Sequence, residues 1–283
     1  MSSSEKMVEE LCLDEDEKKR RVDELKRMIQ DDKILSRFPF TDEVYLDRFL
    51  GGTSFVVEEA FARLKTYYEL LSEFPEWFTT DPPMAKKHLI EKEIRAVLSE
   101  TDREGRPIYL VKLGNCCRNS FFKANCNPSK MELLEIVAVD DIWIESILLN
   151  SPSEKGLCVL VDIANFHLKS VKWLTPHNIK TAVKKIQCLP FKDYRFHVVN
   201  NHMMVKPVVK ILWPFLPDSI KDVIKFHFDD RDSLHEFIDP HILPPEYGGR
   251  NSDIDYKGIF RQLFEQNERI FESFRLYRQL QLV

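Results

Sequence analysis

The chain has 283 residues, of which 43% are hydrophobic and 31% charged, so it can form one large domain with a helical extension. Its formal net charge of −5 argues against a nucleic-acid binder, because contacts to backbone phosphates need a basic face. The amino-terminal residues are too charged for a secretory signal, and no window reaches the ~20 apolar residues of a membrane span. We therefore expect a cytoplasmic protein.

The first hundred residues predict a small all-α domain, which we place at residues 1–100. Apolar side chains recur at helical spacing in residues 15–29, in a short segment after Thr41 that Gly51 and Gly52 end, and in residues 56–72. Proline-containing breaks follow, and residues 86–98 are expected to be helical again.

From residue 101 the pattern changes to an alternation of strands and helices. Residues 156–163, GLCVLVDI, form a nearly unbroken apolar run, which is typical of a strand buried on both faces of a parallel sheet. The alternation favours an α/β fold with a parallel or mixed sheet and right-handed crossovers. The expected strands are 108–113, 156–163, 195–200 and 223–228, and the expected helices are 129–149, 175–189 and 201–216.

The carboxyl-terminal residues 256–280 predict one tail helix. One side of it carries apolar residues, which indicates packing against the body of the protein, and these are Phe260, Leu263, Phe264, Phe271 and Phe274. We therefore divide the rest of the chain into a main domain at 101–250 and a tail at 251–283.

Residues 201–216, NHMMVKPVVKILWPFL, are unusually apolar for a surface helix. Apolar side chains cover well over half of the helical circumference, whereas an ordinary surface helix shows a stripe on the order of 100° wide. Lys206 and Lys210 share the remaining edge, and the segment is too short to cross a bilayer. Its apolar face therefore needs a further partner, which is more protein, a membrane surface or an oily ligand held inside.

The sequence favours a binding protein over an enzyme. Phosphate-binding glycine loops, zinc-protease motifs and nucleophile elbows are absent. The six cysteines form no C-x-x-C pair and are expected to be reduced thiols, and the eight histidines are scattered, so we expect no metal site and no cofactor. Asp162 ends a strand with no nucleophile or general base predictable nearby, which favours a structural role.

Several motifs follow one another in order over residues 41–249. They are DRFL at 47–50 with Phe55, Glu58, Ala60, Leu64, Tyr67 and Tyr68, GRPI at 105–108, GLCVLVDIANF at 156–166, LPFKDYRFHVVNNHMMVKPVVKILWPFL at 189–216 and ILPPEYGG at 242–249. Together these motifs resemble the CRAL-TRIO (Sec14-like) lipid-binding family, and the nearest subgroup looks like the animal tocopherol-transfer and retinaldehyde-binding proteins.

The resemblance implies an α/β CRAL-TRIO fold, in which a mostly parallel sheet forms the floor of a cavity. Flanking helices and a mobile lid helix enclose one hydrophobic molecule, and a small all-α domain precedes the sheet. Such pockets are mostly apolar with few polar groups. The cavity-wall candidates are Val159, Val161, Ile163, Phe166, Ile179, Val183, Phe196 and Val198. The lid candidates are Met203, Met204, Val208, Ile211, Leu212 and Phe215.

Tocopherol-transfer relatives carry a cationic cleft beside the lid that takes a phosphoinositide headgroup. Lys192 matches one position of that cleft, and the next position falls on Tyr194 with Arg195 beside it. The usual Arg-x-Arg after Phe-Leu is replaced here by Gly51-Gly52-Thr53, which argues against tight phosphoinositide binding. Basic residues near the lid would offset that loss at an anionic surface, and they are Lys206, Lys210 and Lys221.

These observations predict a monomeric lipid-transfer or lipid-chaperone protein that associates transiently with membranes. The resemblance leaves the ligand open among tocopherol-like, retinoid-like and other isoprenoid molecules and phospholipids. The alternative is a lipid-regulated adaptor that recruits partners to membranes through the charged run at residues 14–21.

Overall fold

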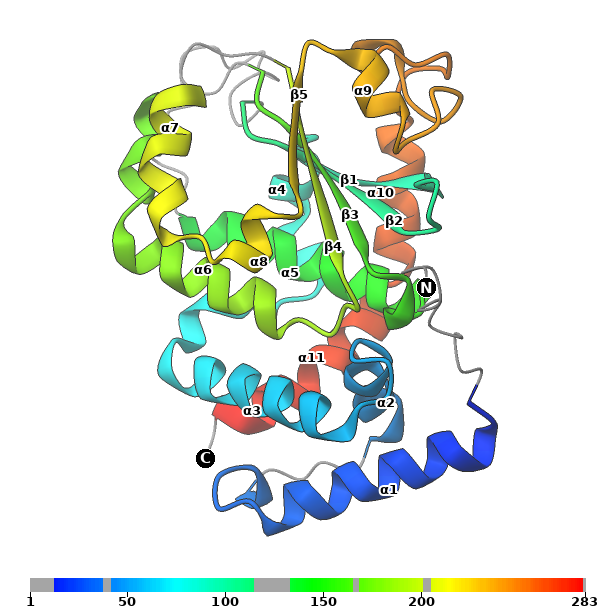
Figure 1. The fold of residues 1–283 in the computed structure, drawn as a ribbon, viewed down its shortest axis with the longest axis vertical. Helices are drawn as coiled ribbons and strands as arrows, with labels where there is room; N and C mark the ends of the chain where they lie inside the picture. Colours follow the sequence, from blue (N-terminus) through cyan, green and yellow to red (C-terminus); the bar gives the residue numbers. More distant parts are fainter. Residues whose placement is uncertain (1–12, 38–41, 115–132, 165–167, 201–204, 282–283) are drawn as a thin grey trace, which may run out of the picture.

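The structure is a computed structural model that describes residues 13–37, 42–114, 133–164, 168–200 and 205–281 (Figure 1). The predicted site residues Phe166, Met203 and Met204 lie outside these ranges. Figure 1 shows a group of amino-terminal helices below a twisted sheet, which has helices on both of its faces.

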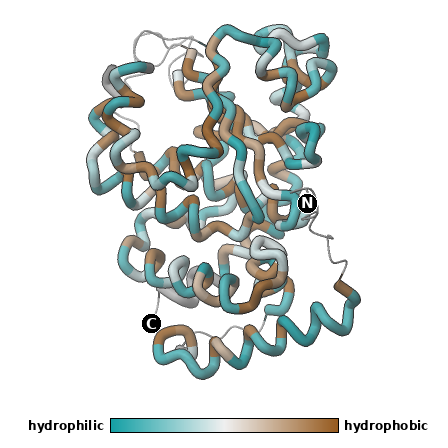
Figure 2. The backbone as a smooth tube through the Cα atoms, viewed as in Figure 1, coloured by the Kyte–Doolittle hydropathy of each residue, from teal (hydrophilic) through white to brown (hydrophobic). Residues whose placement is uncertain are grey.

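Three amino-terminal helices form the predicted helical layer: α1 (Glu15–Asp31), α2 (Glu43–Gly51) and α3 (Val57–Glu73). The Asp14 carboxylate caps α1 by accepting a hydrogen bond from the backbone N–H of Glu17 at 2.7 Å, and Asp42 caps α2 in the same way. Figure 2 shows that most of α1 is hydrophilic, so only a narrow stripe of this helix faces the core. Its buried residues are Val22, Leu25 and Ile29.

The predicted helix at 86–98 is wrong. After short turns at η1 (Leu35–Arg37), η2 (Pro75–Trp77) and η3 (Pro83–Lys86), the helix α4 (Lys87–Ile90) lasts a single turn. Glu93 then has φ of +57°, a left-handed conformation that a continuing helix does not allow. The following residues form β1 (Arg95–Thr101), which pairs antiparallel with β2 (Pro107–Lys112).

The sheet has five strands in the order β1-β2-β3-β4-β5, with β3 (Leu157–Asp162), β4 (Tyr194–Val199) and β5 (Ile224–Phe228). All pairs from β2 to β5 are parallel. The helices α5 (Leu133–Asn150), α6 (Pro176–Cys188) and α7 (Val205–Leu212) lie in the connections between these strands. The predicted α/β fold with a mostly parallel sheet is therefore confirmed.

Shorter elements complete the connections. They are η5 (Ser153–Lys155), η6 (Leu168–Trp173), η7 (Trp213–Phe215), α8 (Asp218–Lys221), α9 (Arg231–His235) and η8 (Pro245–Tyr247).

Each face of the sheet has its own core. On one face Leu157 and Val159 pack with α5, α6 and the amino-terminal helices. On the other face Leu160 packs under the segment after β5, against residues such as Leu234 and Leu243. Because side chains alternate along a strand, consecutive residues of β3 serve different cores.

The tail forms two helices where one was predicted: α10 (Tyr256–Glu265) and α11 (Asn267–Gln281). The chain bends at Gln266, whose side chain accepts a hydrogen bond from the Asn150 amide at the end of α5. Phe260, Ile270 and Phe274 are buried in the main core. The tail therefore packs on the body, and the division of the chain at residues 100 and 250 stays a prediction.

Candidate functional site

A cavity of about 340 Å³ lies between the sheet and the helices α5 and α6. The strands supply alternate residues to it, because every second side chain of a strand points to the same face. Tyr109 and Val111 come from β2, Val159 and Val161 from β3, and Phe196 from β4. The sheet side of the cavity is therefore almost entirely apolar.

The opposite wall comes from the two covering helices and the turns beside them. α5 contributes both apolar and acidic side chains, and α6 contributes a lysine. The lining residues on this side are Trp77, Val137, Asp140, Asp141, Ile144, Ala182, Lys185, Ile186 and Leu189.

Lys185 and Asp141 form an ion pair between α6 and α5, with 2.5 Å between Nζ and Oδ1. The Lys185 ammonium also donates to the backbone carbonyl of Trp77 and lies 4.5 Å from the ring centre of Phe78. The backbone N–H of Thr79 donates to Asp141 Oδ2 at 2.9 Å. Burial raises the pKa of Asp141, and the Lys185 charge opposes that rise.

Asp140 makes a second neutralised cluster beside the first. It accepts hydrogen bonds from Arg95 Nε at 2.5 Å and from the Tyr109 hydroxyl at 2.6 Å. The Arg95 side chain is only 5% exposed, whereas that of Asp140 is 34% exposed, so the arginine alone is nearly removed from water. Burial, followed by the Asp140 charge, raises the pKa of Tyr109, which keeps this phenol a hydrogen-bond donor. The cavity thus combines apolar walls with two paired carboxylates.

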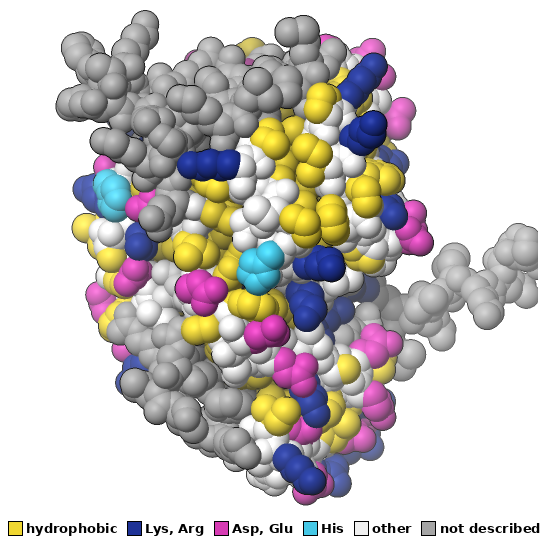
Figure 3. Space-filling view, turned by 90° about the vertical axis from the view of Figure 1, so that its left-hand side faces the viewer, with side chains coloured by type: hydrophobic (Ala, Val, Ile, Leu, Met, Phe, Trp, Pro, Cys, Tyr) yellow, Lys and Arg dark blue, Asp and Glu magenta, His cyan; other side chains and the backbone are white. Residues whose placement is uncertain are grey.

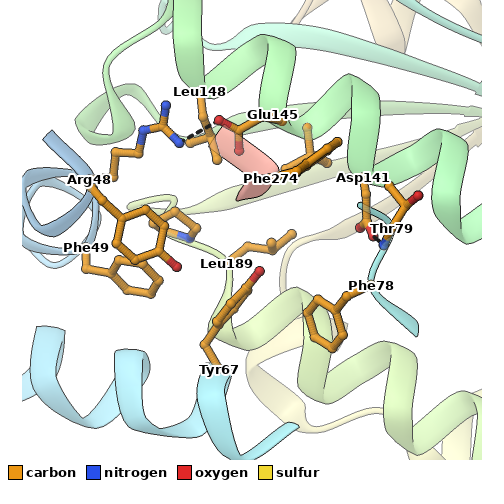
Figure 4. Close-up of a pocket in the computed structure, with 13 residues that line it drawn as sticks. Arg48, Phe49, Tyr67, Phe78, Thr79, Asp141, Glu145, Leu148, Leu189 and Phe274 are labelled. Atoms are coloured by element: carbon orange, nitrogen blue, oxygen red, sulfur yellow. Dashed lines mark hydrogen bonds and ion pairs between the residues drawn. The ribbon is translucent and has the colours of Figure 1, made fainter. Parts of the chain in front are cut away.

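A smaller cavity of about 30 Å³ lies behind the same wall, between α5 and the amino-terminal helices (Figure 4). Asp141, Ile144 and Leu189 line both cavities. In Figure 4 Arg48 of α2 reaches Glu145 of α5, and the two side chains form an ion pair at 2.8 Å. This volume has room for about one or two water molecules, so it serves packing and hydration and is too small for a ligand.

The helix α7 is not packed into a solid interior. None of its described side chains, residues 206–212, is buried, and Ile211 is 38% exposed. An open groove of about 650 Å³ separates it from β5. The groove is lined by Lys206, Val209, Lys210, Trp213, Pro214, Phe226 and Phe228.

The groove and the cavity lie on the same face of the sheet. Phe226 of β5 pairs with Val198 of β4, which is two residues beyond the cavity residue Phe196. Figure 3 looks onto the side of the molecule that carries α6 and α7, where hydrophobic side chains gather in patches with basic side chains between them. A movement of α7 would therefore change access to this face.

Only part of the predicted cavity wall meets in the cavity. Val159, Val161 and Phe196 line it. The others are not among its lining residues: Ile163 and Ile179 are buried, and Val183 and Val198 are partly exposed. Contact with a ligand stays a prediction for all of them.

The predicted lid residues lie on the opposite side of α7 and η7 from the groove. Val208, Leu212 and Phe215 are partly exposed, and together with Ile211 they are absent from the groove lining. The groove instead takes Val209 and Trp213. Contact between the predicted lid residues and a ligand stays a prediction.

The predicted basic residues separate into two places. Lys206 and Lys210 are exposed on α7, and Lys221 forms an ion pair with Asp218 and lies 6.0 Å from the ring centre of Trp213. Lys192 and Arg195 instead flank Asp193, where β4 begins. Asp193 is paired with Arg106 at 2.8 Å, so this region is a structural ion-pair network as well.

The sequence reasoning missed the polar groups of the cavity: Tyr109, Asp140, Asp141 and Lys185. One signal was present, since Asp140 and Asp141 interrupt an otherwise apolar run in α5. Two adjacent carboxylates in a helix that is covered on most sides need partners. Nothing in the sequence alone names Arg95 and Lys185 as those partners.

The buried histidines lie on the other face of the sheet and form a hydrogen-bonded chain. Ser233 Oγ donates to the carbonyl of Asp230, so it accepts from His227 Nδ1 at 2.7 Å. His227 Nε2 then accepts from His197 Nδ1 at 2.9 Å. His197 Nε2 has no hydrogen-bond partner among the described residues. Burial, followed by the proximity of His227, lowers the pKa of His197 to about 3.

The described ranges contain no group of three or more His, Cys, Asp or Glu side chains that could hold a metal ion. Among the helices that the structure describes, none combines the length and the hydropathy that crossing a bilayer requires.

Comparison with known proteins identifies relatives of this chain. Clavesin-2 of Mus musculus is 28% identical over 228 residues, which is 77% of this chain and 66% of that protein. Clavesin-1 of Rattus norvegicus is 29% identical over 77% of this chain and 61% of its own length. Clavesin-1 of Xenopus laevis is 28% identical over 87% of this chain and 75% of its own length. The chain thus spans a little less than two thirds of the first two relatives.

The fold also resembles a solved structure, the crystal structure of Sfh5, with a TM-score of 0.53 and 12% identity over 91% of this chain and 99% of the other. The CRAL/TRIO domain model matches residues 91–249, which include all five strands and every residue of the cavity lining except Trp77. The chain therefore belongs to the CRAL/TRIO domain family of lipid-binding proteins.

Proposed function

We propose that this chain holds one hydrophobic lipid molecule in the cavity between the sheet and α5 and α6. The observation that carries the proposal is the space of about 340 Å³ whose strand-derived wall is almost wholly apolar. Such a volume lies in the range of small-molecule pockets, ~300–1,000 Å³. Removing a lipid chain from water is favourable by ~25 cal/mol for each Å² of apolar surface, so a dry wall of this kind supplies the binding energy.

The bound lipid is then exchanged at membranes when α7 moves. This part of the proposal is supported by the exposure of α7 and by the groove of about 650 Å³ beneath it. The described side chains of α7, at residues 206–212, are all at least partly exposed, so the helix needs little energy to leave its place, because few apolar contacts are lost. Direct identification of the bound molecule distinguishes the ligands that the family resemblance implies: tocopherol-like, retinoid-like and other isoprenoid molecules, and phospholipids.

Membrane contact is proposed to involve the basic side chains around α7. Lys206, Lys210 and Lys221 lie near the apolar groove, and each lysine near an anionic surface contributes ~1 kcal/mol. Phosphoinositides are one anionic lipid class that this arrangement suits. Lys192 and Arg195 are a weaker part of the proposal, because Asp193 lies between them and supplies a compensating negative charge.

The test begins with the purified full chain. Native mass spectrometry and lipid analysis of an extract are expected to find one hydrophobic molecule for each chain. Delipidated protein is then offered fluorescent lipids in donor vesicles, and transfer to acceptor vesicles is followed over time. A folded preparation that retains no lipid and accepts no retinoid, tocopherol or phospholipid contradicts the proposal.

A further inference from the structure

We propose that the cavity selects a lipid that ends in a hydroxyl group, and that Asp141 and Lys185 determine this choice. The inference rests on the proposed lipid-binding function. It concerns the polar end of the ligand, which the apolar strand residues do not distinguish. The geometry assigns the choice to the ion pair between α5 and α6, because both of its members line the cavity.

The first argument is the remaining hydrogen-bonding capacity of these groups. Asp141 accepts one hydrogen bond from Lys185 and one from the Thr79 N–H, whereas a carboxylate offers about four acceptor sites. Lys185 directs its ammonium to Asp141, to the Trp77 carbonyl and to the ring of Phe78. The pair can therefore accept a further hydrogen bond more readily than it can donate one.

The neighbouring Asp140 points to the same conclusion. It already accepts hydrogen bonds from Arg95 and from the Tyr109 hydroxyl, so both of these donors are engaged. A ligand that donates a hydrogen bond fits beside these carboxylates. A hydroxyl group can donate, whereas an ester, a ketone or an ionised acid can only accept.

The second argument is charge. In the two clusters the carboxylates of Asp140 and Asp141 are balanced by Arg95 and Lys185. Within the described lining of the cavity, Lys185 is the single basic residue. A ligand carboxylate or phosphate would therefore be buried beside two carboxylates with no uncommitted cation near it, which is costly in an apolar cavity. A ligand ammonium would instead be buried beside Lys185.

The experiment compares lipids that differ only at the polar end. Delipidated full-length protein is titrated at pH 7.5 with retinol and retinoic acid, and separately with oleyl alcohol and oleic acid. Trp77 lines the cavity, so quenching of tryptophan fluorescence reports the retinoids, and calorimetry reports the oleyl pair. Each alcohol is expected to bind at least about tenfold more tightly than its acid, the ratio that one hydrogen bond to a charged group supplies. The acids are expected to bind more tightly as the pH falls and they become protonated.

Two variants move the preference in opposite directions. Asp141→Asn removes the negative charge and leaves Lys185, so the alcohol-to-acid ratio is expected to fall by about tenfold. Lys185→Met leaves Asp141 without its cation, so the acids are expected to bind still more weakly. The matched control is Asp23→Asn on the exposed side of α1, which is expected to leave the ratio unchanged. Circular dichroism and thermal unfolding establish that each variant is folded.

The outcomes separate the two proposals. If the wild-type protein binds none of the four probes and retains no lipid, the proposed function fails and this inference fails with it. If it binds the acids as tightly as the alcohols, lipid binding stands and the selection for a hydroxyl group is overturned. The same conclusion follows if folded Asp141→Asn and Lys185→Met proteins both keep the wild-type ratio.

Discussion

Filling part of the cavity is expected to stabilise the protein and to weaken ligand binding at the same time. Val159 lies on β3, lines the cavity and is 7% exposed. Replacing it with phenylalanine adds roughly 50 Å³ of side chain, and at ~24 cal/mol for each Å³ of cavity this is worth ~1 kcal/mol in the delipidated state. For a protein of this size, a change of ~1 kcal/mol raises the midpoint of thermal unfolding by roughly 2–4 °C.

The neighbouring residue Leu160 provides the matched control. It points to the opposite face of the same strand, is fully buried and packs in the second core. Leu160→Phe also adds volume, but it does so where the side chains are already in contact. Overpacking of that kind typically destabilises a protein by ~1–3 kcal/mol. The two variants therefore change the unfolding midpoint in opposite directions.

The assay measures thermal unfolding and lipid uptake on delipidated protein. Val159→Phe is expected to unfold at a higher temperature than the wild-type protein and to bind lipid at least tenfold more weakly, because part of a space of about 340 Å³ is occupied. Leu160→Phe is expected to unfold at a lower temperature. If Val159→Phe lowers the midpoint as much as Leu160→Phe does, the space beside Val159 is absent and the reasoning is refuted.

Three further predictions concern the ion pairs, the histidines and α7. Asp193→Asn is expected to destabilise the protein by about 1–2 kcal/mol at pH 7 after allowance for solvent screening, because Arg106 loses a paired partner. Burial raises the pKa of Asp193, but the hydrogen bond from Arg106 outweighs burial and lowers this pKa below 3.8. The difference in stability between Asp193→Asn and the wild-type protein should therefore shrink as the pH falls below that value, and urea unfolding at several pH values measures this difference. Burial lowers the pKa of His197 only in the folded protein, so the unfolded chain binds this proton at a higher pH. The free energy of unfolding should therefore fall by about 2 kcal/mol from pH 6.5 to pH 5. A His197→Phe protein whose stability keeps the same dependence on pH contradicts this prediction. Aspartate at Val208 or Leu212 should slow transfer between vesicles several-fold with an unchanged fold, and unaltered rates would exclude a role for that face of α7.

The parts of the fold that the sequence predicted well are those with one strong periodic signal. The apolar run of β3 and the helical spacing of α1 and α3 each correspond to one element of the structure. The succession from β2 to β5 was likewise predictable, because apolar strands that alternate with amphipathic helices favour a parallel sheet. These elements owe their form to the local pattern of apolar residues.

The strand β1 was not predictable from its own residues. It contains Arg95, Glu100 and Ala96, which suit a helix as well as a strand, and half of it is exposed at the edge of the sheet. Its conformation comes from pairing with β2 and from the ion pair between Arg95 and Asp140 of α5, which lies 45 residues away in the chain. Tertiary contacts of this kind override local propensity.

The sequence predicted an apolar cavity on the sheet, but it predicted only some of the residues that line it. The strand positions Val159 and Val161 follow directly from alternation, and both line the cavity. The helix positions depend on how α6 is rotated against the sheet, and there Ala182 and Lys185 line the cavity where Ile179 and Val183 were expected. A single sequence does not fix that rotation, because α6 also packs against α3 of the amino-terminal helices.

The position of the charged pairs explains how a lipid cavity can be selective without being polar. The strand wall of the cavity supplies affinity that depends mainly on apolar area, and this affinity is similar for any chain of the same length. Asp141 and Lys185 lie across the cavity on the helix side, where their mutual neutralisation removes most of the cost of burying them. As proposed above, an ion pair in this place favours lipids that donate a hydrogen bond and penalises those that carry an uncompensated charge. The specificity of this chain would therefore reside in the helices that cover the sheet, so relatives with the same strands and a different pair of residues at 141 and 185 should prefer a different polar end group.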